Sequence, residues 1–238
     1  MRGIVTLLNA VLLLVLTIEK ASSTDWAVVA ISGDSEIAVF DNARAKLSQE
    51  FSPVASSIVQ LTNDDRLVDG GRRVHENTAD NIIASIRGLR GQTRSNCLIY
   101  FTSHGQKAAG VFIRRANSNV GPSLLNELLK DGCPKRKTVI LISACYSGQF
   151  INDEMKGASR IILTSARSDR TSFGCSSDFE FPYWDECVFQ NLKEAGTWKS
   201  LYEKARACVS VKENERGFEP SEPQAFFGSK VTDLRIFD

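Results

Sequence analysis

The chain has 238 residues, 42% of them hydrophobic, and carries 29 basic and 28 acidic side chains. It is long enough for one large domain that buries roughly 70% of its unfolded surface, and no repeat or long linker indicates a second domain. The near-zero net charge gives no electrostatic case for nucleic acid or an anionic membrane as the main partner.

The chain begins with the pattern of an export signal. Met1-Arg2 supplies a short positive start, and Ile4 to Ile18 is a run of about fifteen mostly apolar residues, too short for a comfortable membrane span. A small-x-small site ending at Ser23 predicts a signal peptide at 1–23 and one domain at 24–238. We therefore expect a secreted or periplasmic protein with no stable membrane span, an uncleaved membrane anchor being the alternative. Because the signal holds two basic residues and one acidic residue, its removal leaves 27 of each charge.

After the signal, short apolar runs alternate with amphipathic segments, and this alternation predicts an α/β fold with a mainly parallel sheet and helices on both faces. In chain order the first predicted elements are a strand at 26–32, a helix at 37–51, a strand at 57–61, a helix at 76–89 capped by Thr78, and a strand from 97 leading to His104. A short strand or hairpin arm at 111–113, a helix at 122–129, a strand from 138 leading to Cys145 and a brief helix at 150–156 follow. The last predicted elements are a strand at 160–166, a loop at 167–183, and helices at 184–195 and 198–213.

The strands leading to His104 and to Cys145 organise the rest of the chain. Neither apolar run has helical spacing, and each is followed by a glycine, as expected for a fully buried strand. A helical pattern lies between them, so the two strands are predicted to be parallel neighbours. Ligands bind beyond the carboxyl ends of such strands. We therefore expect His104 and Cys145 to lie at one crevice.

All six cysteines lie in the predicted mature part, at positions 97, 133, 145, 175, 187 and 208. In an exported protein some of them should pair. Cys97 and Cys133 each precede one of the two central strands, so a bridge between them is predicted at the end opposite the crevice. If Cys145 stays free, one more cysteine is left unpaired, and the sequence does not say which. Pairing of all six in three disulfides is the alternative.

The chain lacks the motifs of several enzyme classes, namely G-x-S-x-G, H-E-x-x-H, a Walker loop and a G-x-G-x-x-G after the first strand. With two histidines and no C-x-x-C, it predicts neither a metal site nor another cofactor. His75 lies in a charged turn and reads as a solvated loop residue. His104 and Cys145 are thus the only Cys/His combination at strand ends.

This pair is suited to attack on a carbonyl group. A thiolate at Cys145 is the nucleophile, and an imidazole at His104 can accept its proton and later protonate a leaving amine. The backbone N–H groups of Gly105 and Cys145 are the natural donors for the oxyanion. The simpler interpretation is that Cys145 is a small apolar filler at the end of a buried strand.

Two motifs carry a family resemblance. Phe101-Thr102-Ser103-His104-Gly105 and Ile142-Ser143-Ala144-Cys145-Tyr146-Ser147-Gly148 resemble the catalytic motifs of the legumain-like cysteine peptidases, the group that includes asparaginyl endopeptidase and the catalytic subunit of glycosylphosphatidylinositol transamidase. Thr164-Ser165-Ala166 followed by Ser172 looks like the small-residue strand end of this family. With Thr171-Ser172-Phe173-Gly174-Cys175, the cysteine motif is most similar to the exported bacterial branch.

The resemblance implies a caspase-like fold, which is a three-layer α/β/α sandwich, and a cysteine endopeptidase that cleaves a peptide or protein substrate through a His104/Cys145 dyad and a thioester acyl-enzyme. Ser177-Asp178-Phe179 resembles the segment that lines the substrate pocket, so Asp178 is a candidate substrate-binding residue, together with Ser165 and Tyr146. Members that cleave after asparagine have an acidic residue where this chain has Tyr146, and 35–42 offers no match for their pocket arginine. Asp178 would equally suit a basic or a small polar side chain.

Two alternatives remain open. A transpeptidase or ligase would use the same acyl-enzyme with an amine instead of water as acceptor. A catalytically silent caspase-like module would bind peptides without cleaving them, although the presence of both dyad residues speaks against this. The natural substrate, zymogen activation and the oligomeric state are not determined by the sequence.

Overall fold

The computed structural model describes residues 25–64, 68–69 and 72–237. The predicted signal peptide lies outside the described residues. Within them, no helix is both long and apolar enough to cross a membrane.

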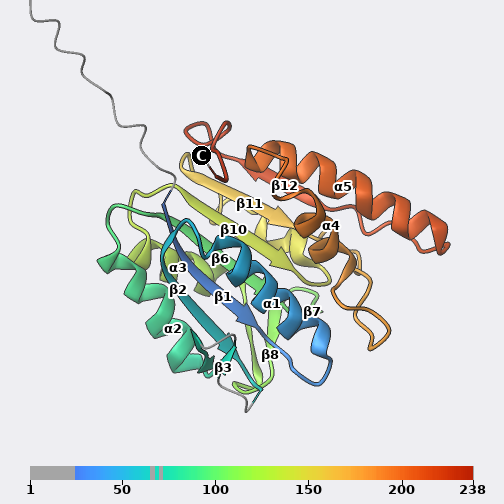
Figure 1. Ribbon diagram of the computed structural model, residues 1–238, viewed down its shortest axis with the longest axis horizontal. Coiled ribbons are helices and arrows are strands. Elements are labelled where there is room, and N and C mark those ends of the chain that lie inside the picture. The colour runs from blue at the N-terminus through green and yellow to red at the C-terminus, as the bar shows by residue number, and fades with distance from the viewer. Residues whose placement is uncertain (1–24, 65–67, 70–71, 238) are drawn as a thin grey trace, which may run out of the picture.

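A seven-stranded sheet forms the middle of the molecule, with strand order β12-β11-β10-β6-β1-β2-β5 (Figure 1). Only β12 runs antiparallel to its neighbour, which is β11. The four strands at the centre of this sheet are buried along almost their whole length, as expected where helices cover both faces. The bounds of the strands are β1 Trp26–Ser32, β2 Ala55–Thr62, β5 His75–Glu76, β6 Asn96–Thr102, β10 Thr138–Ser143, β11 Arg160–Thr164 and β12 Gln224–Phe227.

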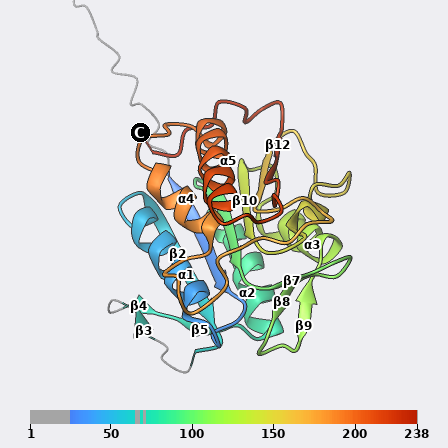
Figure 2. The ribbon, with the colours of Figure 1, turned by 90° about the vertical axis from the view of Figure 1, so that its right-hand side faces the viewer.

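Helices cover the two faces of this sheet in separate layers (Figure 2). On one face α1 (Ala38–Phe51), α4 (Tyr183–Asn191) and α5 (Trp198–Glu215) enclose an apolar cluster with alternate residues of the strands. On the other face α2 (Ala79–Gly88) and α3 (Pro122–Gly132) enclose a second cluster with the intervening residues. The predicted three-layer α/β/α sandwich with a mainly parallel sheet is therefore confirmed.

A small second sheet and a β-ribbon complete the fold. The sheet consists of β7 (Gly105–Gln106), β8 (Gly110–Ile113) and β9 (Ser118–Val120), and it follows directly from the end of β6. It includes the short strand predicted at 111–113. The ribbon pairs β3 (Val68–Asp69) with β4 (Arg72–Arg73).

Local signals explain where α2 and α3 begin. The side chain of Thr78 accepts a hydrogen bond from Asn81 N at 3.2 Å, which confirms the predicted cap of α2. Pro122 stands at the first position of α3, where its fixed φ favours a helix. The helix was predicted to begin at residue 76, but the segment before Thr78 is not helical. His75–Glu76 instead forms β5, which pairs with the edge of β2. His75 is exposed, but it lies in this edge strand and not in a loop.

The helix predicted at 150–156 is wrong. The chain forms a short 3₁₀ helix, η2 (Ser147–Phe150), and then a series of turns. Asn152 explains the difference, because its side-chain oxygen accepts a hydrogen bond from Met155 N at 3.0 Å. Such a side chain to backbone bond offers the chain an alternative to continuing a helix.

Two disulfides connect elements of the sandwich. Cys97–Cys133 joins the start of β6 to the end of α3 and confirms the predicted bridge, while Cys187–Cys208 joins α4 to α5. Cys145 and Cys175 are free, so the prediction that Cys145 leaves one partnerless cysteine is confirmed and the alternative of three disulfides is wrong.

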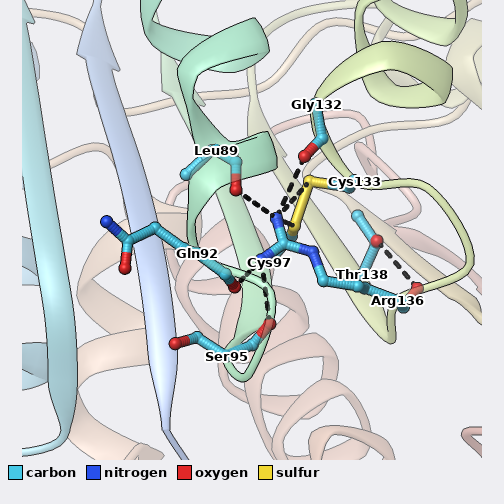
Figure 3. The surroundings of a disulfide bond; sticks show 8 residues. All are labelled: Leu89, Gln92, Ser95, Cys97, Gly132, Cys133, Arg136 and Thr138. Carbon is cyan, nitrogen blue, oxygen red and sulfur yellow. Dashed lines mark hydrogen bonds between the residues drawn. A yellow bond between two sulfur atoms is a disulfide. The ribbon is translucent and has the colours of Figure 1, made fainter.

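Arg136 lies beside the first disulfide and donates several hydrogen bonds there (Figure 3). Its guanidinium donates to the carbonyl oxygens of Leu89 and Gly132, which lie at the ends of two helical segments, and to those of Gln92 and Ser95. One side chain thus donates to four carbonyl oxygens at or after the ends of these segments. The disulfide and Arg136 together fix the edge of the sandwich opposite the crevice.

Candidate active site

The register of the sheet brings His104 and Cys145 to one rim. Strands β6 and β10 are parallel neighbours, and Thr102 pairs with Ser143 at their carboxyl ends. His104 follows Thr102 by two residues, and Cys145 follows Ser143 by two residues. The pairing continues beyond the ladder, because Ser103 N donates to Ser143 O at 3.0 Å. The two residues therefore stand at equivalent positions just beyond the ends of adjacent strands.

Gly105 lies directly against the main chain of Cys145. A Cβ atom at Gly105 would lie 1.9 Å from the carbonyl oxygen of Cys145 and 3.0 Å from its nitrogen. Any side chain at position 105 would therefore separate the two segments. This contact places the backbone after His104 beside the free thiol.

Hydrogen bonds from a distant loop hold the turn that presents Cys145. Ser172 N points at the sulfur, 3.3 Å from Sγ, and Tyr146 N donates to Arg170 O at 2.8 Å. Tyr146 itself adopts φ 59°, a left-handed conformation that is uncommon for a residue other than glycine. Residues in such conformations cluster at functional sites, where the surrounding structure holds them in place.

Ser165 supports the same turn from below. Its side chain is buried, and its hydroxyl is 2.9 Å from both Ala144 N and Ala144 O. Both groups belong to the residue before Cys145. The structure thus shows Ser165 in contact with the backbone of the turn, while its predicted contact with substrate stays a prediction.

His104 projects from the rim toward α1. Its ring packs edge-on against Phe40 with the centroids 5.1 Å apart, and 43% of its side chain is exposed. The carboxylate of Asp34 faces the ring, with Oδ2 3.9 Å from His104 Nε2. This distance is too long for a hydrogen bond but short enough for a direct electrostatic effect.

Asp34 is the centre of a charged cluster beside His104. Its buried carboxylate accepts two hydrogen bonds from Arg114, at 2.7 and 2.8 Å, and one from Glu36 N at 2.9 Å. Burial alone would raise the pKa of Asp34, but these donors and the charges of Arg114 and His104 outweigh it and lower the pKa. Asp34 is therefore ionised wherever the protein is folded near neutral pH.

The sequence alone did not single out Asp34. Its partner Arg114 comes from the segment after β8, and the β7–β8 hairpin fixes that segment, because Phe112 N donates to His104 O at 2.9 Å. The available signal was its position, since Asp34 follows a strand that is adjacent to β6 and ends at the same rim.

Asp178 is exposed in the loop before α4. Its one hydrogen bond among the described contacts is local, from Ser176 Oγ at 3.5 Å. The neighbouring Phe179 packs against Tyr183 and lies under the guanidinium of Arg216. The described contacts thus place Asp178 near the ends of α4 and α5, and none of them joins it to Cys145.

A buried acid that the sequence analysis did not single out lies below the rim. Asp185, in the first turn of α4, is fully buried and accepts hydrogen bonds from Tyr100, Thr102 and Ser143. Burial raises the pKa of Asp185 to about 6, even though the three hydroxyl donors lower it. The signal in the sequence was a Ser or Thr near the end of each central strand, which offers hydroxyl groups to a common acceptor.

Comparisons with known proteins identify the family and the fold of the chain. The chain matches the model of the peptidase C13 family over residues 33–232, a span that includes His104 and Cys145. It is similar to the crystal structure of caspase-1 from Spodoptera frugiperda, with a TM-score of 0.60 and 13% sequence identity over 90% of this chain and 93% of the caspase chain. At this identity the similarity shows the fold alone, and it confirms the expected caspase-like fold. No curated protein matches the chain.

Proposed function

The chain belongs to the peptidase C13 family, and from this premise we infer that it is a cysteine endopeptidase in which His104 and Cys145 form the catalytic dyad. The observation that carries the proposal is the joint placement of both residues. The imidazole and a free thiol follow paired residues on adjacent strands, and Gly105 contacts the main chain of Cys145.

The reaction follows from this arrangement. Cys145 Sγ attacks the scissile carbonyl carbon, and the thiol proton passes to His104. The backbone N–H groups of Gly105 and Cys145 donate to the oxyanion that forms. The C–N bond then breaks, the departing amine takes a proton from His104, and a thioester remains on Cys145. Water attacks the thioester, releases the acid product and returns the proton to the dyad.

Asp34 places a fixed negative charge beside His104. Its carboxylate faces the ring from 3.9 Å, and Arg114 and Glu36 N hold it there. Because Asp34 is ionised and fixed, its negative charge faces the ring that receives the thiol proton. In this proposal Asp34 acts through His104.

Substrate selection is proposed to depend on the loop after β11 and on the turn at Cys145. Tyr146 lies half-buried beside the nucleophile, where its ring can contact the residues flanking the cleaved bond. Asp178 offers an exposed carboxylate for a basic or a small polar side chain. Asparagine preference has no specific support, because the residue after Cys145 is not acidic.

We propose export as well, into the extracellular space or a bacterial periplasm, and membership of the exported bacterial branch of the family. Two disulfides among the described residues support an oxidising compartment. N-terminal sequencing of the protein made in cells tests this proposal. A mature end at Thr24 is expected, whereas an intact Met1 would indicate an uncleaved anchor.

The function itself is tested by cleavage-site profiling of a diverse peptide library, with wild type and Cys145→Ala side by side. Cleavage by wild type alone is expected, and the aligned products report the preferred side chain before the cleaved bond. An added amine distinguishes hydrolysis from transfer, because a transpeptidase would join it to the product. Equal cleavage by both proteins, or none by folded wild type, would contradict the proposal.

A further inference from the structure

Asp185 is a fully buried carboxylate that bonds to the two strands leading to His104 and Cys145. It lies in the first turn of α4, which packs on the same face of the sheet as α1 and α5 (Figure 2). Its Oδ1 accepts a hydrogen bond from Tyr100 at 2.7 Å. Its Oδ2 accepts one from Thr102 at 3.1 Å and one from Ser143 at 2.7 Å. One side chain thus joins a helix to two adjacent strands.

The partners of Asp185 are unusual for a buried acid. Buried carboxylates in proteins are normally paired with a basic group, yet all the described donors to Asp185 are neutral hydroxyls. Asp41 of α1 is also buried and accepts from hydroxyls at the ends of β1 and β2. It differs from Asp185 because it pairs with Arg44 at 3.4 Å. An apolar residue at position 185 would avoid the cost of burying a charge. The position therefore keeps an acid at the expense of stability.

The two strand-end hydroxyls connect Asp185 to the dyad. Thr102 and Ser143 are paired with each other across the sheet, and each precedes a dyad residue by two positions. We propose that Asp185 is a positioning residue for the peptidase reaction, whose carboxylate ties the ends of β6 and β10 together and so sets the relative position of His104 and Cys145. This inference rests on the proposed function.

The tie depends on the protonation state of Asp185. An ionised carboxylate accepts all three hydroxyl bonds, whereas a protonated one carries a hydrogen on one oxygen and must give up or invert one of them. Burial raises the pKa of Asp185 to about 6, so the change occurs in mildly acidic solution. The tie is complete above this pH and weakens below it.

Neighbouring groups do not titrate in the same range. Tyr100 on β6 and Cys175 in the loop before α4 face Asp185, and burial raises the pKa of both, that of Cys175 to about 12. The charge of Arg44 on α1 also acts on Tyr100. A change near pH 6 in this cluster therefore belongs to Asp185.

Kinetics of matched variants provide the first test, with the best peptide from the library. Asp185→Asn, Ser143→Ala and Thr102→Val each break a link to a strand end, and each should lower kcat, by about 10- to 100-fold for Asp185→Asn because small displacements of reacting groups are costly. Tyr100→Phe removes a hydrogen bond to the same carboxylate away from the strand ends, and Thr102→Ser keeps the hydroxyl. Both should retain kcat within about threefold.

The second test does not require peptidase activity. The backbone amide resonances of Gly105 and Cys145 are followed by NMR as the pH is varied, in protein that carries His104→Gln so that the imidazole does not titrate. Chemical-shift changes with a midpoint near pH 6 are expected, because the strand ends respond to Asp185. They should disappear when Asp185→Asn is added.

The outcomes separate the two proposals. Loss of the amide titration on adding Asp185→Asn, together with the kinetic pattern above, supports the positioning role. An unchanged kcat in Asp185→Asn, an equal loss in Tyr100→Phe, or the absence of an amide titration would overturn it. A loss restricted to substrates with a basic side chain would instead assign Asp185 to substrate binding and overturn the positioning role. If the amides titrate as expected but wild type cleaves no peptide, the tie stands and the peptidase assignment fails.

Discussion

His104 and Cys145 contribute little to the core, although they lie at the ends of two of its strands. The side chain of His104 is 43% exposed, and Cys145 is half-buried, with its sulfur 3.3 Å from Ser172 N. Substitution of either residue should therefore reduce the reactivity of the site and leave the stability of the fold nearly unchanged. Substitution of a side chain inside either apolar cluster would lower the stability as well.

We expect Cys145→Ser to abolish labelling by a peptidyl electrophile. His104→Ala should abolish it or slow it by roughly 10²–10⁴-fold. The free energy of unfolding should change by about 0.5 kcal/mol or less in each. Intact-mass analysis of the labelled protein and urea unfolding measure the two quantities. Large destabilisation by either variant would contradict the division between site and scaffold.

Tyr146 shows how the site is built at the scale of one residue. Its left-handed backbone turns the chain away from β10 immediately after the nucleophile, and Arg170 O receives its N–H. The loop that contains Arg170 and Ser172 thus holds both Tyr146 and the sulfur of Cys145. A feature of this kind arises from contacts between residues 24 and 27 positions apart, and local sequence patterns do not report it.

At the scale of elements, the disulfide between β6 and α3 is the clearest scaffold feature at the end of the sheet opposite the site. We expect Cys133→Ser to lower the free energy of unfolding by about 2–4 kcal/mol, because it opens a loop of 36 residues in the unfolded chain. Chemical denaturation measures this loss. Labelling of Cys145 should be unchanged well below the unfolding temperature.

Cys175→Ser is the matched control for this disulfide prediction, because Cys175 forms no disulfide. Its unfolding free energy should stay closer to that of wild type. A comparable loss in Cys133→Ser and Cys175→Ser would mean that the bridge adds no specific stability.

The elements themselves were largely predictable, because each strand and helix is specified by its own apolar pattern. Trp26–Ser32 agrees with β1 at both ends, and Thr78 marks the start of α2. The errors occurred where a tertiary contact or a side-chain turn decided the outcome. His75–Glu76 became a strand because β2 offers a free edge, and the segment after Phe150 is a series of turns because Asn152 bonds to it.

The site was predictable only in part, for a related reason. His104 and Cys145 could be paired because each follows an apolar strand and the connection between them favours parallel neighbours. Asp34 and Asp185 could not, since their roles depend on Arg114 from the β8 segment and on α4, which is more than 80 residues from Tyr100 and Thr102. The sequence shows the hydroxyl residues near the strand ends, but it does not show that Asp185 accepts their hydrogen bonds.

For the whole molecule, buried acids make stability depend on pH in two opposing ways. The folded-state pKa values of Asp185 and Glu213 are raised by burial, so the native state binds more protons than the unfolded state, and stability falls as the pH rises through this range. Burial also disfavours the charged forms of Asp34 and Glu50, but their basic partners outweigh it and lower the pKa values. Their contribution is present above the unfolded pKa and is lost in stronger acid.

Asp185 should dominate the mildly acidic range, because its pKa of about 6 compares with an ordinary value of 3.8. A shift of this size corresponds to a stability loss on the order of 3 kcal/mol between pH 4 and pH 8. We therefore expect wild type to be most stable near pH 4–5, and Asp185→Asn to lose less stability than wild type as the pH rises. Urea unfolding of both proteins at pH 4.5, 6 and 7.5 measures the difference, and parallel curves would show that Asp185 titrates alike in the folded and unfolded chains. If the curves diverge while Asp185→Asn also loses activity, the acid stabilises the active arrangement at the expense of the fold, which is the behaviour expected of a group kept for function.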